Sequence, residues 1–402
     1  MHVNADLHIH SKYSAATSAR MDLPTLTREA AKKGIGLIGT GDCLHPKWLS
    51  DIKVLKPVDE GTFVANDTRF VLTCEIEDSA RVHHLLILPS ISKAEELQER
   101  LASFSNLASD GRPKVRLNGK QLAQHAKDVG ALFGPAHAFT PWTAMYAYFD
   151  SLIDCYGPMA SHVAFIELGL SADSDYADRI AELQNLTFLT NSDAHSPWPI
   201  RLAREFNRFE MGAPTFEELK QAILRKNGRK PILNVGLPPE EGKYNESACI
   251  RCYKHYSLQI CQERKWRCTC GGLIKKGVRD RVSELADYEK PRHPQHRPPY
   301  LRLIPLAEII ALALGVSDSN TKAVRDVWGT MVSALGNEVT ILVDADIGQL
   351  NMVDESVREA ILAFREGRII LHPGGGGQYG RVELPQGFRA QSKSQCSLSN
   401  FL

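Results

Sequence analysis

The sequence predicts an α/β protein with an alternating strand–helix region, a small cysteine-rich unit and a C-terminal α/β unit. Three observations support this. Residues 1 to about 235 alternate short apolar runs with amphipathic segments, residues 245–275 are rich in cysteine, lysine and arginine, and alternation resumes after a proline-rich stretch. A chain of 402 residues is long enough for two or three cores. Alternation on this scale is typical of a parallel sheet or barrel.

Apolar periodicity and capping residues predict the individual elements. Asp22-Leu23-Pro24 is typical of a helix start, and Gly34 is typical of its end. The first region is expected to contain strands at 2–9, 35–39, 70–74, 84–88, 131–135, 162–166 and 187–190, and helices at 22–34, 93–104, 120–129 and 215–226. The last region is expected to contain helices at 306–314, 321–334 and 355–366, and strands at 339–344 and 368–371.

These patterns divide the chain into 1–238, 239–290 and 291–387, followed by a serine-rich tail, 388–402, whose composition predicts disorder. No signal peptide is visible, and the longest apolar run, 304–316, is too short to span a bilayer. The net charge of +1 averages over segments of different sign and indicates no partner. Cysteines crowded into one segment favour zinc over disulfides. We therefore expect a cytoplasmic protein without a membrane partner.

Histidines and carboxylates stand near the ends of several predicted strands, mostly the carboxyl ends, where barrel enzymes build their active sites. The candidates are His8, His10, Asp42, His45, Glu75, His83, His137, Asp193 and His195. Imidazole nitrogens and carboxylate oxygens suit divalent ions such as zinc, and a site holding two or three of them can hydrolyse phosphoesters. We expect the loss of Asp193 or Glu75 to abolish activity.

Three choices stay open at this stage. His83 and His84 point to opposite faces of a strand, so only one can face the metals, and we favour His83. Glu167 ends a strand and fits either a substrate-side or a structural role. A phosphate clamp has three candidates, which are Arg201, Arg204 and Lys47.

The cysteine-rich unit has the spacing of a zinc site. Cys249 and Cys252 form one close pair, and Cys268 and Cys270 form a second pair about fifteen residues later. Four thiolates predict a closed, structural zinc site with no open position for chemistry. Cys261 lies in an apolar pattern and is expected to be a small buried residue.

Lysine, arginine and aromatic residues surround these cysteines. We expect Lys275 and Lys276 to contact nucleic acid, because such a surface suits a phosphate backbone and unstacked bases. A solvated basic face is the alternative. Gly375, Gly376 and Tyr379 in the glycine-rich loop are expected to contact substrate through free backbone amides, although a plain flexible loop fits the sequence equally well.

The motif Asp6-Leu7-His8-Ile9-His10, the Glu75 motif, His137 and Ser192-Asp193-Ala194-His195 resemble the PHP (polymerase and histidinol phosphatase) superfamily. The resemblance implies a distorted (β/α)7 barrel with two or three active-site ions (Zn, Mn or Mg). His8, His10, Glu75 and Asp193 would hold one ion, Glu75 would bridge to a second on His83 and His137, and Asp42, His45 and His195 would hold the third. The second motif of many family members has adjacent Asp and His residues. This chain departs from that pattern, because Cys43 follows Asp42 and the nearest histidine is His45.

The segment from Trp266 to Val278, the run from Ile304 to Ile310 and the loop from Pro373 to Tyr379 are similar to one branch, the endonuclease Q family of DNA-repair nucleases. This resemblance implies cleavage on the 5′ side of uracil, hypoxanthine, xanthine or abasic sites in DNA. A phosphatase for small phosphomonoesters or nucleotides is the alternative enzyme, and a zinc-dependent nucleic-acid scaffold is the alternative non-enzyme. A sliding clamp is a further candidate partner, since Gln395–Leu402 faintly resembles a clamp-binding peptide.

Overall fold

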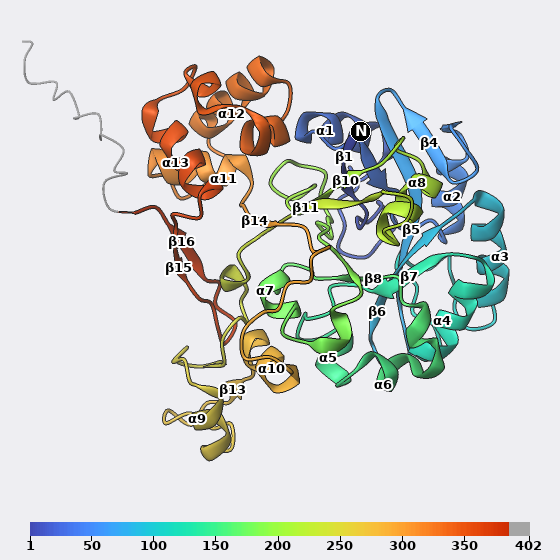
Figure 1. Cartoon of the computed structure of the whole chain (residues 1–402), viewed down its shortest axis with the longest axis horizontal. Coiled ribbons are helices and arrows are strands. Elements are labelled where there is room, and N and C mark those ends of the chain that lie inside the picture. Colours follow the sequence, from blue (N-terminus) through green and yellow to red (C-terminus); the bar gives the residue numbers. More distant parts are fainter. Residues whose placement is uncertain (386–402) are drawn as a thin grey trace, which may run out of the picture.

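The structure is a computed structural model, and it describes residues 1–385. The predictions for the serine-rich tail and for the segment Gln395–Leu402 lie outside the described residues. Figure 1 shows a large α/β body, a cysteine-rich unit and a helical unit, with the strand pair β15–β16 between the last two.

A mixed ten-stranded sheet forms the frame of the body, in the order β14-β11-β10-β1-β2-β5-β4-β3, with β6 on β5 and β7 on β6. Its strands are β1 (His2–Asp6), β2 (Leu37–Gly39), β3 (Lys56–Pro57), β4 (Thr62–Ala65), β5 (Thr68–Glu77), β6 (His83–Leu88), β7 (Leu132–Pro135), β10 (Phe206–Glu210), β11 (Lys230–Gly236) and β14 (Tyr300–Arg302). A separate parallel pair consists of β8 (Phe165–Glu167) and β9 (Thr187–Leu189). Within residues 1–385 no hydrogen-bonded ring of strands closes, so the expected seven-stranded barrel is not confirmed.

Asparagine side chains take the place of a strand ladder between β9 and its neighbours. Nδ2 of Asn207 donates to the carbonyl of Thr190 at 2.7 Å, and Oδ1 of Asn207 accepts from the amide of Thr190 at 2.9 Å. Nδ2 of Asn234 donates to the carbonyl of Phe188 at 3.2 Å. Both asparagines are fully buried, so these bonds satisfy backbone groups that a ladder would otherwise pair.

Strand direction places the turn of the hairpin β5–β6 at the edge of the sheet where the parallel strands end. β1, β2 and β5 run parallel, whereas β6 runs antiparallel to β5 and to β7. The start of β6 therefore lies beside the carboxyl ends of β5 and β7. For this reason a histidine at the beginning of β6 can join residues that follow the other strands.

Helices flank the sheet and mostly match the sequence-based expectations. Asp22 caps the first helix by accepting from the amide of Thr25 at 2.9 Å, and Gly34 ends it with φ 88°. The helices of the body are α1 (Leu23–Lys33), α2 (Pro46–Ile52), α3 (Ile91–Leu101), α4 (Gly119–Asp128), α5 (Met145–Tyr148), α6 (Leu152–Tyr156), α7 (Ser174–Ala177) and α8 (Phe216–Ile223), with 3-10 turns η1 (Gly157–His162), η2 (Ala181–Leu183) and η3 (Pro239–Glu241). In the described part of the chain, every helix is too short or too polar to cross a lipid bilayer.

The cysteine-rich unit is small and has its own core. It contains β12 (Ala248–Cys249), α9 (Leu258–Glu263), β13 (Ile274–Lys275) and α10 (Val278–Leu285). Cys261 is fully buried beside Tyr256 and Ile274, as the sequence predicted for a cysteine outside the zinc set.

The C-terminal unit is helical, and one predicted strand there is wrong. It contains α11 (Leu306–Leu314), α12 (Lys322–Leu335), η4 (Thr340–Asp344), η5 (Ile347–Leu350), α13 (Glu355–Arg365), β15 (Ile370–His372) and β16 (Arg381–Glu383). The expected strand at 339–344 is the π-helical turn η4. The guanidinium of Arg365 donates to the carbonyls of Ile341 and Leu342 in this turn, and both residues are buried. Tertiary packing therefore overrides the strand propensity of a β-branched run.

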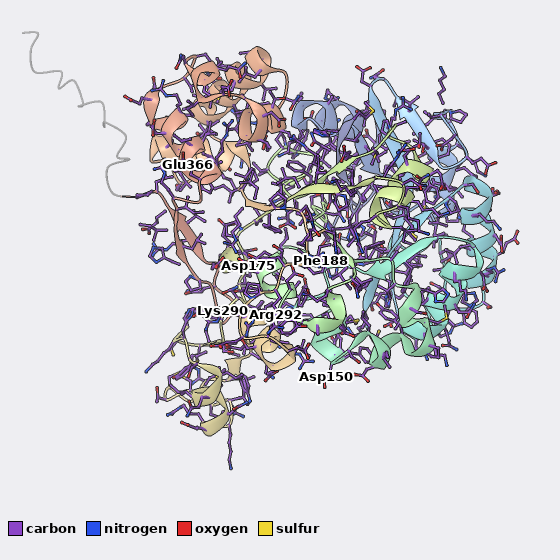
Figure 2. The ribbon with its side chains drawn as sticks, viewed as in Figure 1. Asp150, Asp175, Phe188, Lys290, Arg292 and Glu366 are labelled. Atoms are coloured by element: carbon purple, nitrogen blue, oxygen red, sulfur yellow. The ribbon has the colours of Figure 1, made fainter. Side chains whose placement is uncertain are left out.

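The proline-rich stretch between the two smaller units lies along the body (Figure 2). Asp178, which is fully buried, accepts from the guanidinium of Arg297 at 2.8 Å and lies 2.8 Å from Nδ1 of His293. The same guanidinium stacks 3.3 Å from the ring centre of Phe188. The chain then pairs with β11 as β14, so the expected third unit begins with a strand of the main sheet.

Candidate metal centres

The ends of the body strands bring most of the expected ligand residues together. Three groups each have ligand atoms within 4.8 Å of one another: His8–His10–Glu75, His10–Asp193–His195 and Glu75–His83–His137. Glu75 and His10 each belong to two groups, so the three groups form one continuous cluster.

Glu75 lies at the centre of this cluster, with its side chain fully buried. Its Oε1 lies 2.7 Å from Nδ1 of His83 and 2.8 Å from Nε2 of His137. Its Oε2 lies 3.3 Å from Nε2 of His10. One carboxylate therefore faces both halves of the cluster, as a bridging ligand must.

Several buried polar atoms of the cluster have no hydrogen-bond partner within residues 1–385. They are Nε2 of His8, Nε2 of His10, Nδ1 of His137 and Oδ1 of Asp193. Oδ1 of Asp193 lies 3.7 Å from Nε2 of His8 and 3.2 Å from Nε2 of His10. Leaving such atoms unsatisfied costs free energy, and a cation among them would remove that cost. The residues present therefore fit divalent ions.

The carboxylates also control protonation in the cluster. Burial by itself would lower the pKa of His8, but the charges of Glu167 and Glu75 outweigh it and raise that pKa well above the usual range. Burial opposes the charged form of Glu75 as well, yet the surrounding histidines, His83 first, hold its pKa well below the usual range. A bound cation would take the place of protons on these histidines, so affinity should rise with pH.

Glu167 supports the cluster from behind and does not belong to its ligand groups. Its carboxylate lies 2.9 Å from Nδ1 of His8 and accepts from the amide of His137 at 2.7 Å and from Nδ2 of Asn191 at 2.7 Å. A carboxylate on the far nitrogen of a ligating histidine fixes the tautomer and the ring orientation. Of the two roles left open for Glu167, the structure favours the structural one.

The second sequence motif does not assemble as the resemblance implied. Asp42 lies against Nδ1 of His10 at 3.1 Å, and its other oxygen accepts from the amide of Ser11 at 2.6 Å. His45 donates to the carbonyl of Ala108 at 3.2 Å and stacks on Tyr13, and it does not join the cluster. Cys43 and Leu44 separate Asp42 from His45, and His45 is the N-cap of α2, so its ring points away from the ligand cluster. Asp42 thus orients His10, and the expected set Asp42–His45–His195 is not formed.

The choice between His83 and His84 follows from the strand geometry. His83 faces Glu75, whereas Nδ1 of His84 lies 3.1 Å from the hydroxyl of Tyr156 and its Nε2 lies 3.2 Å from Asp78. Neighbouring strand residues point to opposite faces, so His84 belongs to the core behind the sheet.

Three residues of the region have positive φ, a conformation that non-glycine residues rarely adopt: Asp42 at 47°, His137 at 31° and Asp193 at 47°. Strained backbone of this kind persists where the surroundings determine it, and it concentrates at functional sites. Gly169 packs so closely on His137 that an added Cβ would lie 2.5 Å from the Cβ of His137.

A cavity of about 430 Å³ opens beside the cluster. Its walls include three cations that the sequence analysis missed, which are Arg81, Arg112 and Lys114. Nη1 of Arg112 lies 3.2 Å from Oε2 of Glu75. None of the earlier clamp candidates lines this cavity. Arg201 and Lys47 are exposed, and Arg204 donates to the carbonyl of Ser192. Arg112 stands in an irregular polar loop, where no periodicity marks it.

The four expected cysteines meet in the cysteine-rich unit. Sγ of Cys249 lies 3.5 Å from Sγ of Cys270, and Sγ of Cys252 lies 3.5 Å from Sγ of Cys268. Thiolates about 2.3 Å from a tetrahedral zinc stand about 3.8 Å apart. A hydrogen bond from the hydroxyl of Tyr256 to Cys268 lowers the pKa of that thiol to about 5. The set therefore fits a closed zinc site.

The basic charge around this unit is partly neutralised. Lys276 pairs with Glu284 at 2.6 Å, and Arg281 pairs with Asp150 at 2.6 Å. Within residues 1–385, Lys275 makes no ion pair, and its Nζ lies over the ring of Trp142.

The glycine-rich loop differs in part from the expectation of free amides, since the amide of Gly375 is bonded within the loop. Gly375 and Gly376 are buried, and an added Cβ on Gly375 would lie 2.8 Å from the Cβ of Ala248. The amide of Gly375 donates to the carbonyl of Gln378, and the amide of Gly377 donates to the carbonyl of Lys243. The glycines thus allow close packing on the cysteine-rich unit. Tyr379 remains 71% exposed.

Comparisons with known proteins agree with this architecture. Residues 305–368 match the family model of the MJ0043 C-terminal domain. An uncharacterized protein of Methanocaldococcus jannaschii, MJ0043, is 47% identical over 254 residues, which are 62% of this chain and 31% of that protein. This chain thus spans about a third of the length of that relative.

Two solved structures resemble nearly the whole chain. The lesion-specific endonuclease PfuEndoQ from Pyrococcus furiosus is 48% identical, with a TM-score of 0.93 and coverage of 98% of both chains. Endonuclease Q in complex with a 27-mer duplex carrying an abasic lesion is 48% identical, with a TM-score of 0.91 and coverage of 98% of this chain and 100% of that one. Because this identity extends over nearly the full length, the chain belongs to the endonuclease Q family.

Proposed function

We propose that this chain is a metal-dependent DNA-repair endonuclease. It hydrolyses the phosphodiester on the 5′ side of uracil, hypoxanthine, xanthine or an abasic site. The observation that carries the proposal is the convergence of unpartnered buried atoms of His8, His10 and Asp193 around Glu75. This convergence occurs in a chain 48% identical to an endonuclease solved with an abasic duplex.

The cluster would hold two or three divalent ions (Zn, Mn or Mg), on His8, His10, Glu75, His83, His137, Asp193 and His195. When bound, such ions supply positive charge that stabilises the negative charge developing on the phosphate. Glu75 belongs to two of the ligand groups, and Oδ1 of Asp193 lies 3.2 Å from Nε2 of His10, the other ligand that two groups share. Removal of Glu75 would therefore disturb more than one ion position, and removal of Asp193 would take away the only carboxylate of its ligand group.

Arg112 is the cation best placed to bind the phosphate beside this cluster. Its guanidinium lines the cavity, contacts Glu75 at 3.2 Å and is 24% exposed. Lys114 and Arg81 extend the positive charge along the same wall. A guanidinium offers two parallel donors to phosphate oxygens, so Arg112 would orient the strand for attack.

The three units would divide the work. Residues 1–238, which carry the metal ligands at the ends of the strands, would cut the DNA strand. Residues 239–290 would be held together by a structural zinc on Cys249, Cys252, Cys268 and Cys270. Residues 291–387 would complete the surface that binds DNA. Lys275, Lys276 and the exposed Tyr379 would contact the DNA, whereas Gly375 and Gly376 would act by holding the loop that carries Tyr379.

A deaminated base cannot be inspected inside a duplex, so the target nucleotide would be extruded, which costs least at a mismatch or an abasic site. Such a substrate would be met in the cytoplasm. A sliding clamp stays a candidate partner.

A nicking assay tests the proposal. Duplexes carrying uracil, hypoxanthine or an abasic site are compared with an undamaged duplex and with a phosphomonoester, with and without a chelator. We expect chelator-sensitive nicking of damaged duplexes only, and its loss in Asp193→Asn. Hydrolysis of the phosphomonoester without nicking would establish the phosphatase, and DNA binding without any hydrolysis would establish the scaffold.

A further inference from the structure

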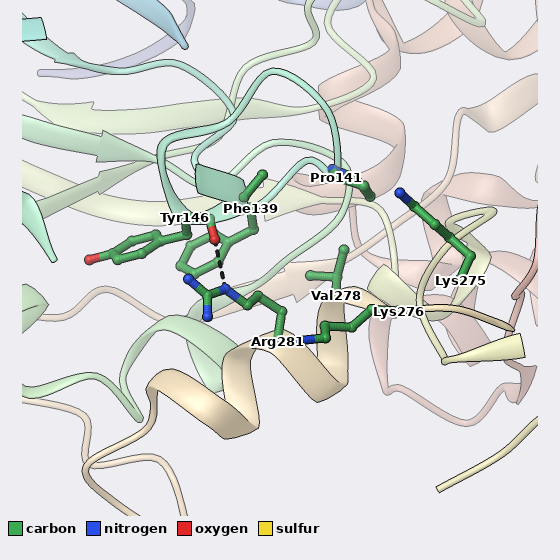
Figure 3. A pocket seen from close by; sticks show the side chains of 9 residues that line it. Phe139, Pro141, Tyr146, Lys275, Lys276, Val278 and Arg281 are labelled. Atoms are coloured by element: carbon green, nitrogen blue, oxygen red, sulfur yellow. Dashed lines mark hydrogen bonds between the residues drawn. The ribbon is translucent and has the colours of Figure 1, made fainter. Parts of the chain in front are cut away.

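The loop of residues 137–147 separates two cavities. His137, Thr140 and Thr143 line the cavity beside the metal cluster. Phe139, Pro141 and Tyr146, from the same loop, line a second cavity of about 350 Å³ (Figure 3). Residues of this one loop therefore line both cavities, so a single loop separates the second cavity from the candidate active site.

The opposite wall of the second cavity comes from the cysteine-rich unit, at residues 275–281. Arg281 is fixed in place, because its Nε donates to the carbonyl of Tyr146 at 2.8 Å (Figure 3) and it also pairs with Asp150. Lys276 is held by Glu284. Among the cations of this wall, Lys275 alone lacks a carboxylate partner within residues 1–385.

Trp142 lies in this loop between the residues that face the two cavities, and it is 42% exposed. Nζ of Lys275 lies 3.5 Å from the centre of its ring. The ring of Tyr244 stands perpendicular to the indole, at 88° and 5.3 Å between centres. Tyr244 thus supports the indole from the side, while the side chain of Lys275 covers a face of it.

We propose that Trp142 is a stacking platform for an unpaired nucleotide beside the second cavity, whose lining includes its neighbour Pro141 and its contact Lys275, next to the nucleotide that is cut. This inference rests on the proposed function. In the free protein Lys275 occupies the indole face, and on binding the base takes that place while the ammonium moves to the backbone phosphate. Aromatic faces stack on any base, and an unpaired lysine is attracted to phosphate.

The charge of the site favours a nucleic-acid strand as the occupant. The wall presents Lys275, Lys276 and Arg281, of which Lys275 alone lacks a carboxylate partner within residues 1–385, and no carboxylate is among the lining residues. The floor is apolar and aromatic, formed by Phe139, Tyr146 and Val278. A positively charged rim above an aromatic floor suits an unstacked base with its phosphate.

The test uses full-length protein with its metals and a duplex carrying an abasic site beside 2-aminopurine. The dissociation constant is measured by anisotropy, and the environment of the probe base by its fluorescence. Trp142→Ala should raise the dissociation constant on the order of tenfold and change the probe signal, whereas Trp142→Phe should retain both properties. Zinc content and circular dichroism show that each variant is folded.

The neighbouring lysines provide a matched pair for the charge. Lys275→Ala should weaken binding and reduce the slope of log K against log salt by about 0.7 to 0.9, the change expected for one phosphate contact. Lys276→Ala should change the slope less, because Glu284 already compensates its charge.

The outcomes separate the two proposals. If the wild-type protein nicks no damaged duplex, the proposed function fails whatever Trp142 does. If the wild type nicks damaged DNA, and Trp142→Ala matches it in both affinity and probe signal, the stacking site is refuted while the proposed function stands.

Discussion

Nδ1 of His8 lies 2.9 Å from Oε2 of Glu167, and both side chains are only 1% exposed. This contact holds one nitrogen of the imidazole and directs the other, Nε2, toward Glu75 and Asp193. The ligand geometry therefore depends on a residue outside the ligand groups.

Glu167→Gln should weaken divalent metal binding by about 10- to 100-fold, because the amide lacks the charge that orients and polarises His8. The fold should survive, since the amide oxygen can still accept from the amide of His137. Calorimetric titration with Zn²⁺ or Mn²⁺ measures the effect. Glu182→Gln, which removes a carboxylate that contacts Tyr146 away from the cluster, serves as the control. Equal metal affinities in the two variants would show that the Glu167 contact does not contribute to metal binding.

Gly169→Ala should reduce nicking by about tenfold or more, since misplaced catalytic groups cost rates of this order. An added Cβ would lie 2.5 Å from the Cβ of His137, and φ at this position is 68°. Gly228→Ala is a matched control, because its φ is 75° and nothing lies within 4 Å of an added Cβ. Both variants carry the same backbone strain, so a difference in rate reports the displacement of His137.

Cys268→Ser should release zinc from the cysteine-rich unit. The closed site needs all four thiolates, and this variant keeps only three. Cys261→Ser should retain the zinc, because Cys261 lies in the small core and outside the ligand group. Zinc is measured by atomic absorption after dialysis. Retention of zinc by Cys268→Ser would contradict the proposed site.

Glu205→Gln should stabilise the protein increasingly as pH rises. Burial raises the pKa of Glu205 to about 8, above its unfolded value of about 4.3. The folded state thus keeps a proton that the unfolded state releases, so stability from this group falls between about pH 4 and pH 8. The variant cannot ionise, and its advantage should grow by about 3 kcal/mol between pH 6 and pH 9. Denaturant unfolding at both pH values measures it, and a constant difference would be inconsistent with the raised pKa.

Residues with a local signal were placed well from the sequence. The Asp22 cap and Gly34 mark α1 at the expected bounds, and the cysteine spacing brings four thiols together. His83 was favoured correctly over His84 as the residue facing Glu75, because strand alternation is a local property.

Features that depend on long-range packing could not be predicted from local sequence patterns. The turn at Ile341 is helical because Arg365, distant in sequence, binds its carbonyls. His45 misses the cluster because the start of α2 turns it away. Arg112 has no pattern around it, and only the folding of its loop onto Glu75 reveals it.

The pairing of β14 with β11 has a consequence for experiments on fragments. A protein truncated at residue 238 would lose the strand that covers this edge of the main sheet and the Arg297 partner of the buried Asp178. An uncovered strand edge invites intermolecular pairing, and a buried carboxylate without its partner is strongly destabilising. The excised catalytic body should therefore aggregate on expression, whereas deletion of the helices after Arg302 should leave this edge protected.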